Sequence, residues 1–133
     1  MLIQYGTLPL RRGPEGAVEL LLVTSRDTGR WVVPRGNPIR GLAPHQSAAQ
    51  EAWEEAGVRG AVSDQPLGRY RYKKRRKLGF SVRAQVQLFE MLVTEVLEDW
   101  PERHQRRRAW FAPVDAAAAV DEPELKALIL AIG

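Results

Sequence analysis

Residues 36–58 read GNPIRGLAPHQSAAQEAWEEAGV, and this stretch decides the fold. Its first part is dense in glycine and proline, which predicts a loop of definite shape rather than a flexible linker. Its second part predicts a helix over Pro44–Ala56, because proline suits the first turn of a helix and Gly57 suits the position just past its end. The spacing Ser47-x-x-Gln50 offers a capping box for a later start of the same helix.

Three glutamates share one face of this predicted helix. At about 100° per residue, Glu51, Glu54 and Glu55 fall together, and the opposite, buried side is covered by small or apolar residues, Ala48, Ala49, Ala52, Trp53 and Ala56. Carboxylates at this spacing repel one another, and near a helix C-terminus they also oppose the macrodipole. The helix carries no lysine or arginine to offset them. A divalent cation that prefers oxygen ligands would offset the repulsion between these carboxylates. The alternative is that the three glutamates form a solvated acidic patch.

Composition restricts the class of protein. The chain has 133 residues, of which 44% are hydrophobic and 27% charged, so we expect one globular domain over 1–133. It has no cysteine and two histidines, which excludes disulfides and zinc–thiolate sites and leaves oxygen ligands for any metal. No apolar run is long enough to span a membrane, and the first residues do not resemble a signal peptide. We therefore expect a cytoplasmic protein without a membrane partner.

Positive charge is concentrated in two short stretches. The net charge is +4, but residues 69–77 and 103–108 hold 11 of the 20 lysines and arginines. Arginine outnumbers lysine 16 to 4, and its planar fork matches phosphate oxygens well. The distribution predicts a phosphate-rich partner, with solvated basic loops as the alternative.

The rest of the chain predicts a mixture of strands and helices. Patterns of apolar residues and turn signals predict strands at Leu2–Leu10, Ala17–Ser25, Trp31–Val33, Leu67–Lys74, Gly79–Val96 and Arg108–Ala112. Two further helices are predicted over Pro113–Val120 and Glu122–Ile132. A helix inserted between groups of strands indicates an α/β or α+β fold.

The loop and helix resemble the Nudix box, G-x5-E-x7-R-E-U-x-E-E-x-G-U with U apolar. The matching positions are Gly36, Glu51, Ala52, Glu54, Glu55, Gly57 and Val58. Leu42 stands where the pattern has Glu, and Gln50 stands where it has Arg. In the family these two are expected to form a supporting ion pair, so their joint replacement leaves no charge unpaired. We interpret this as an altered scaffold around an intact metal site.

Further stretches, including 21–36 and 93–111, resemble the branch of diphosphoinositol polyphosphate and diadenosine polyphosphate phosphohydrolases. The resemblance implies the Nudix fold, a mixed β-sheet sandwiched between helices with a loop–helix–loop metal site. It implies that Glu51 and Glu55 bind Mg²⁺, with Mn²⁺ as a possible substitute. It also implies that Gly36 offers a carbonyl oxygen and that Glu54 is the general base acting on the attacking water.

The same resemblance implies a set of residues that bind the phosphates of the substrate, namely Ser25, Arg26, Arg30, Arg35, Lys74 and Arg75. The expected reaction is Mg²⁺-dependent hydrolysis of a phosphoanhydride in diadenosine polyphosphates or diphosphoinositol polyphosphates. Two alternatives stay open: a pyrophosphohydrolase acting on the 5′ end of RNA, and a non-catalytic module that binds phosphate or RNA.

Overall fold

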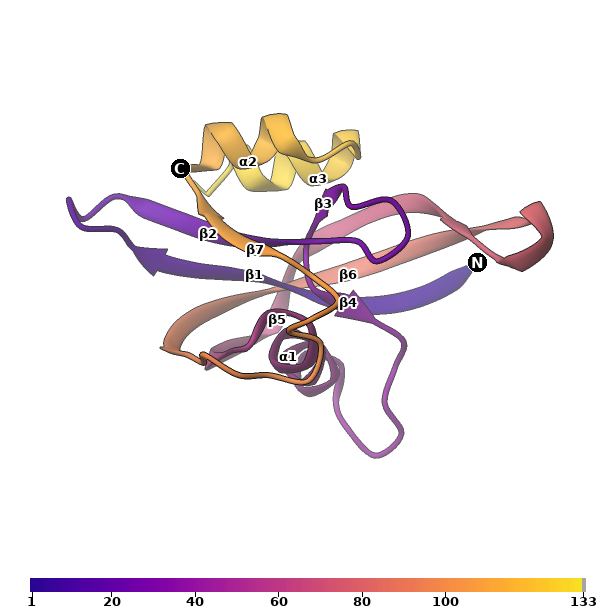
Figure 1. Ribbon diagram of the computed structural model, residues 1–133, viewed down its shortest axis with the longest axis horizontal. Coiled ribbons are helices and arrows are strands. Elements are labelled where there is room, and N and C mark those ends of the chain that lie inside the picture. The colour runs from indigo at the N-terminus through magenta and orange to yellow at the C-terminus, as the bar shows by residue number, and fades with distance from the viewer. Residues whose placement is uncertain (133) are drawn as a thin grey trace.

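A computed structural model describes residues 1–132, and within them a seven-stranded mixed sheet lies between helices (Figure 1). The strands are β1 (Leu2–Arg12), β2 (Val18–Thr24), β3 (Trp31–Val32), β4 (Arg35–Gly36), β5 (Val58–Arg75), β6 (Ser81–Val96) and β7 (Arg108–Phe111). The helices are α1 (Pro44–Ala56), α2 (Pro113–Ala119), α3 (Pro123–Leu130) and the short 3₁₀ helix η1 (Lys77–Gly79). None of these helices has the length and apolar character needed to cross a membrane.

Strand β1 is the central strand of the sheet. Its main order is β3-β2-β1-β6-β5, with β4 paired to β1 and β7 to β2. Strands β1 and β6 run parallel over the register Leu2↔Ala84 to Leu10↔Leu92, and the other pairs are antiparallel. The predicted mixed α/β architecture is confirmed.

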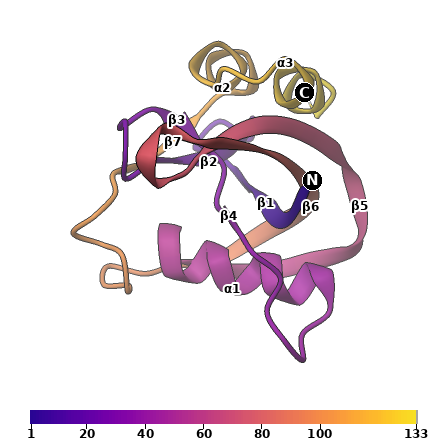
Figure 2. The ribbon, with the colours of Figure 1, turned by 90° about the vertical axis from the view of Figure 1, so that its right-hand side faces the viewer.

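Two hydrophobic cores lie on opposite faces of the sheet, with α1 on one face and α2 and α3 on the other (Figure 2). Strand β2 serves both, because successive side chains of a strand point to opposite faces. Leu20 and Leu22 pack toward α2 and α3, whereas Leu21 and Val23 pack toward α1. All four are fully buried, as expected for a continuous apolar run in a strand covered on both faces.

Helix α1 begins and ends as the sequence predicts, but its N-terminal cap differs. The amide of Ala43 donates a hydrogen bond to Gln46 Oε1 at 2.8 Å, so the helix starts at Pro44. The predicted capping by Ser47 is wrong, because its Oγ instead accepts a hydrogen bond from the Ile39 amide at 3.0 Å and ties down the preceding loop. Gly57 ends the helix with φ 65°, a left-handed conformation that favours glycine.

Strand β5 and the loop before α1 differ most from their predictions, whereas the other strands end within two residues of their predicted bounds. Strand β5 begins at Val58 rather than at the predicted Leu67. Its first part was not predicted because register shifts between Arg59 and Gly68 break the alternation of side chains that marks a strand. Residues Arg35 and Gly36, predicted as loop, form β4 opposite Tyr5 and Gly6 of β1. This short pairing anchors the loop before α1 to the centre of the sheet.

Candidate metal and phosphate site

A cleft of about 420 Å³ gathers almost all of the predicted site residues. Its walls come from β1, the turn after β2, β4, α1, β5 and the loop before β7. The predicted residues that line it are Ser25, Arg26, Arg30, Arg35, Gly36, Glu51, Glu55, Lys74 and Arg75. The structure thus brings the acidic face of α1 and the first basic stretch of the sequence into one cleft.

Glu51 and Glu55 form a crowded carboxylate pair on the cleft side of α1. Burial is the main cause that raises the pKa of Glu51 to about 7, and the neighbouring charges of Glu54 and Glu102 add to it. Burial also raises the pKa of Glu55 to about 8, against the attraction of Arg106. Each carboxylate is therefore costly to ionise in this environment unless a cation joins it.

Gly36 lies directly against this pair. A Cβ at position 36 would overlap the Glu51 carboxylate as it lies here, so any side chain at this position would displace that carboxylate. Within residues 1–132, no three acidic or histidine side chains are already gathered as a metal site. The donors present are two carboxylates and a nearby backbone carbonyl, all oxygens, and this set fits Mg²⁺ or Mn²⁺.

Glu54 is the one predicted site residue that does not line the cleft. Its Oε1 accepts a hydrogen bond from Gln50 Nε2 at 3.4 Å, within the same helix. Gln50 and Leu42, the two departures from the Nudix box, line one separate hollow of about 630 Å³ beside Trp53. The interpretation of these two departures as a jointly replaced ion pair stays a prediction.

Arg35 projects into the cleft between two tyrosines of β5. Its Nη1 donates to the Tyr70 hydroxyl at 3.0 Å, and its guanidinium lies 3.9 Å over the ring of Tyr72. Burial works against the charge, yet Tyr70, Tyr72 and Glu122 favour it, so the pKa of Arg35 stays above its usual value. A charged fork is thus held in place by aromatic contacts at the floor of the cleft.

Several other cations face the same space. Burial lowers the pKa of Lys74, and so do the positive charges of Arg76, Arg35 and Arg26. Arg26 donates a hydrogen bond to Gln105 Oε1 at 3.1 Å, which holds it at the rim. Like charges brought together in this way repel one another, and an anion placed among them would relieve the repulsion.

The remaining predicted phosphate contacts already have partners. Arg30 Nη1 lies 2.9 Å from Glu122 Oε2 and 3.6 Å from Asp121 Oδ2 at the start of α3. The Ser25 hydroxyl shares a 2.7 Å hydrogen bond with the Thr28 hydroxyl in the turn after β2. Both residues line the cleft, but Arg30 is held toward α3 rather than free at its centre.

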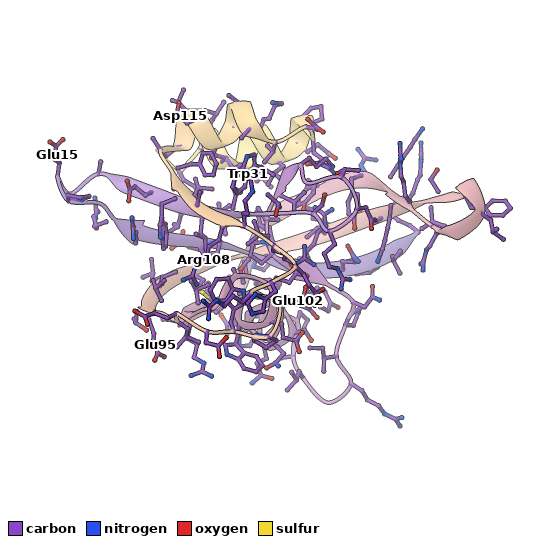
Figure 3. All side chains as sticks on the ribbon, viewed as in Figure 1. Glu15, Trp31, Glu95, Glu102, Arg108 and Asp115 are labelled. Atoms are coloured by element: carbon purple, nitrogen blue, oxygen red, sulfur yellow. The ribbon has the colours of Figure 1, made fainter. Side chains whose placement is uncertain are left out.

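The sequence analysis did not predict a salt-bridge network that is centred on the loop before β7. Arg106 is nearly buried, with Nη2 at 3.4 Å from Glu55 Oε2 and Nε at 2.8 Å from Glu102 Oε1. Glu102 lines the cleft and is labelled in Figure 3. In the sequence, Arg106 is one arginine of a basic run and Glu102 a single acid, so neither carries a signal of its own. The compensating cation expected for the acids of α1 therefore comes, in part, from another segment of the chain.

The C-terminus of α1 receives a second cation. Arg108 of β7 donates to the carbonyls of Ala56 at 2.8 Å, Gly57 at 3.3 Å and Leu97 at 2.6 Å, and it lies 3.8 Å over the Trp100 ring. In Figure 3 this side chain projects from the strand that runs past α1. A cation at this end of a helix offsets the macrodipole that the glutamates oppose.

The cleft combines a carboxylate pair with a cluster of cations, a charge pattern complementary to a metal ion and a phosphate chain. The chain belongs to the Nudix family, since the family's NUDIX domain model matches residues 6–131. The predicted resemblance to this family is confirmed, and so is the resemblance to diphosphoinositol polyphosphate phosphohydrolases.

Curated relatives and solved structures agree with this assignment. The mitochondrial Nudix hydrolase 12 of Arabidopsis thaliana is 34% identical over 105 residues, 74% of this chain and 50% of that protein. Diphosphoinositol polyphosphate phosphohydrolase 3-alpha of Mus musculus is 36% identical over 99 residues, 73% of this chain and 56% of that protein. The chain thus spans about half the length of the curated relatives it matches. A C. elegans Ap4A hydrolase binary complex has a TM-score of 0.72 at 20% identity, covering 99% of this chain and 95% of that chain, and so shares the fold.

The carboxylate pair predicts opposite effects of one substitution on stability and on metal binding. Glu51→Gln removes a charge that repels its neighbours, so the midpoint of thermal unfolding without metal is expected to stay the same or rise. The same change removes a metal ligand, so Mg²⁺ binding measured by isothermal titration calorimetry is expected to weaken at least about tenfold. Glu90→Gln, on β6 and outside the cleft, is the matched control. Unchanged Mg²⁺ affinity in Glu51→Gln would contradict the assignment.

Proposed function

We propose that this chain hydrolyses a phosphoanhydride bond of a polyphosphorylated small molecule in the presence of Mg²⁺. The observation that carries the proposal is the set of mutually repelling cations at Arg26, Arg35 and Lys74, which faces the Glu51–Glu55 pair across one cleft. A polyphosphate supplies several negative charges in a row, and a divalent cation can bridge such a chain to carboxylates. A ligand with one phosphate would leave most of these cations without a partner.

In this proposal Glu51, Glu55 and the carbonyl of Gly36 hold Mg²⁺. When bound, the ion screens phosphate oxygens and makes a water molecule acidic enough to attack phosphorus. Arg35 binds phosphate oxygens at the floor of the cleft, and Lys74 and Arg75 bind those nearer the mouth. Ser25, Arg26 and Arg30 complete the wall on the opposite side.

Glu54 is the proposed general base, as the Nudix box implies. Its carboxylate accepts a hydrogen bond from Gln50 and adds to the negative charge around Glu51, although Glu54 itself is not among the residues that line the cleft. Glu102 already lines the cleft and is the second candidate for the base. Arg106 bridges Glu102 and Glu55, and so holds both carboxylates in position.

The names of the relatives suggest which polyphosphates to test. Curated relatives are diphosphoinositol polyphosphate phosphohydrolases, and a chain of the same fold is an Ap4A hydrolase. We infer the same two substrate classes here, diadenosine polyphosphates and diphosphoinositol polyphosphates. The cytoplasmic location expected from the sequence stays a prediction, since relatives with mitochondrial names are also similar.

A substrate panel with a base-deficient variant tests the reaction. Product release with Mg²⁺ would be measured on diadenosine penta- and hexaphosphate, a diphosphoinositol polyphosphate and a 5′-triphosphorylated RNA. We expect turnover of the long polyphosphates, and a loss of about a hundredfold or more in kcat for Glu54→Gln at unchanged KM, because general bases contribute on that order. Glu102→Gln is assayed alongside, and a kcat loss confined to it would move the base to Glu102.

Two outcomes of the panel would contradict the proposal. Turnover of the RNA alone would keep the chemistry and change the substrate class to RNA 5′ ends. Binding of polyphosphate with no turnover of any compound would mean a non-catalytic module, with Leu42 and Gln50 marking the loss of activity.

The stacked arginine at the floor of the cleft predicts a separate effect on substrate binding. Arg35→Lys keeps the positive charge but loses the planar fork and its stacking on Tyr72. We expect KM for a long polyphosphate to rise about tenfold with little change in kcat. Arg40→Lys in the exposed loop before α1 is the control and is expected to behave as the unsubstituted protein. Equal KM values for the two variants would show that Arg35 does not bind substrate.

A further inference from the structure

The hairpin between β5 and β6 extends away from the body of the protein, at the right of Figure 1. Three apolar side chains near its turn are exposed to solvent: Leu78 at 92%, Phe80 at 69% and Val82 at 36% of their surface. We call these three residues the apolar tip. Among the exposed large apolar residues of the described chain, Leu78 has the greatest exposure.

The turn displays Leu78 in an unusual backbone conformation. Its φ of 67° lies in the left-handed region, where a bulky side chain is rare and where glycine would be at lower cost. A hydrogen bond from the Arg76 amide to the Phe80 carbonyl at 2.6 Å closes the loop around it. Leu78 and Phe80 therefore flank Gly79 at the end of the hairpin, held apart from any core.

Strong positive charge surrounds the apolar tip. Residues 65–89 contain eight lysines and arginines and no acidic residue. Among the hairpin side chains that the structure describes, Arg71 pairs with a carboxylate, Glu124 of α3, at 3.2 Å. Lys73 and Arg83 face each other across the two strands, and Lys74 and Arg75 continue the charge to the mouth of the cleft.

We propose that this hairpin docks the protein onto an anionic lipid surface, with Leu78 and Phe80 entering the interface and the surrounding cations contacting headgroups. Apolar side chains and basic side chains on one surface are the two signals that together give stable interfacial binding. Charge complementarity selects an anionic rather than a neutral surface. Single-stranded RNA fits less well, because bases stack on aromatic rings and Phe80 is the one aromatic side chain among the three of the apolar tip.

This proposal concerns the surface of a membrane, not a span through it, and differs from the expectation from sequence that the protein has no membrane partner. The basic run can be recognised in the sequence, but the apolar tip cannot, because the exposure of Leu78 and Phe80 is a property of the fold. Docking in this way would place the mouth of the cleft, with Lys74 and Arg75, beside the lipid surface. It is independent of whether the cleft hydrolyses polyphosphates.

The absence of cysteine from the chain allows a direct test of insertion. Leu78→Cys, labelled with a polarity-sensitive fluorophore, would be mixed with vesicles of phosphatidylcholine alone or of equal parts phosphatidylcholine and phosphatidylglycerol. We expect a blue shift and a rise in emission with the anionic vesicles only. Labelled Val114→Cys on α2, which is 70% exposed and outside the hairpin, is the matched control and is expected to show neither change.

The full chain without label tests affinity. We expect vesicle flotation to show at least about tenfold weaker binding to the anionic vesicles for the double variant Leu78→Ser, Phe80→Ser. The matched double variant Val114→Ser, Leu130→Ser, with exposed side chains on α2 and α3, is expected to bind as the unsubstituted protein. Thermal midpoints of both variants would show that they are folded, which exposed positions permit.

Two results would overturn the proposal. The first is no association with anionic vesicles, or association that both double variants retain equally. The second is binding of a single-stranded RNA oligomer that the hairpin variant loses, in the absence of vesicle binding at the same salt concentration. Hydrolysis assays in solution without lipid report on the proposed function alone, so its failure and the failure of this proposal are distinguishable.

Discussion

Two carboxylates held close together beneath the surface impose the main constraint on this structure. Glu51 and Glu55 sit on consecutive turns of α1, and burial together with their surroundings makes both difficult to ionise. A pair of this kind lowers the stability of the folded protein when no metal is bound. It becomes favourable when a divalent cation binds between the carboxylate oxygens. The elements around α1 make contacts that offset part of this electrostatic cost.

Three segments that are distant from α1 in the sequence make these contacts. Strand β4 brings Gly36 against Glu51 with no side chain in the way. The loop before β7 brings Arg106 to Glu55, and β7 itself brings Arg108 to the last carbonyls of α1. Opposite this arrangement, Arg35 is clamped by the tyrosines of β5. One cleft therefore holds the carboxylates of α1, with Arg106 beside them, and the cations Arg35 and Lys74, a combination complementary to a metal-bound polyphosphate.

The sequence predicted what depends on local spacing and missed what depends on distant contacts. The bounds of α1 and the common face of Glu51 and Glu55 follow from periodicity and the Nudix pattern, whereas the cleft positions of Arg35 and Lys74 were expected from the resemblance to the phosphohydrolase branch. The bridge from Arg106 to Glu55 joins residues 51 positions apart, and no local pattern encodes it. The early part of β5 was missed because its bulges interrupt the alternation of side chains. The hydrogen bond that Glu54 accepts comes from Gln50, a position where the chain departs from the family pattern.

The central claim is that Glu51, Glu55 and Gly36 form a metal site that shares one cleft with the phosphate-binding cations. A crystal structure with Mn²⁺ and a non-hydrolysable diadenosine polyphosphate, with Mn²⁺ located by its anomalous signal, tests it most directly. We expect the ion at oxygen-ligand distance from both carboxylates, and phosphate oxygens within hydrogen-bond reach of Arg35 and Lys74. Mn²⁺ bound away from α1, or phosphates bound outside the cleft, would contradict it.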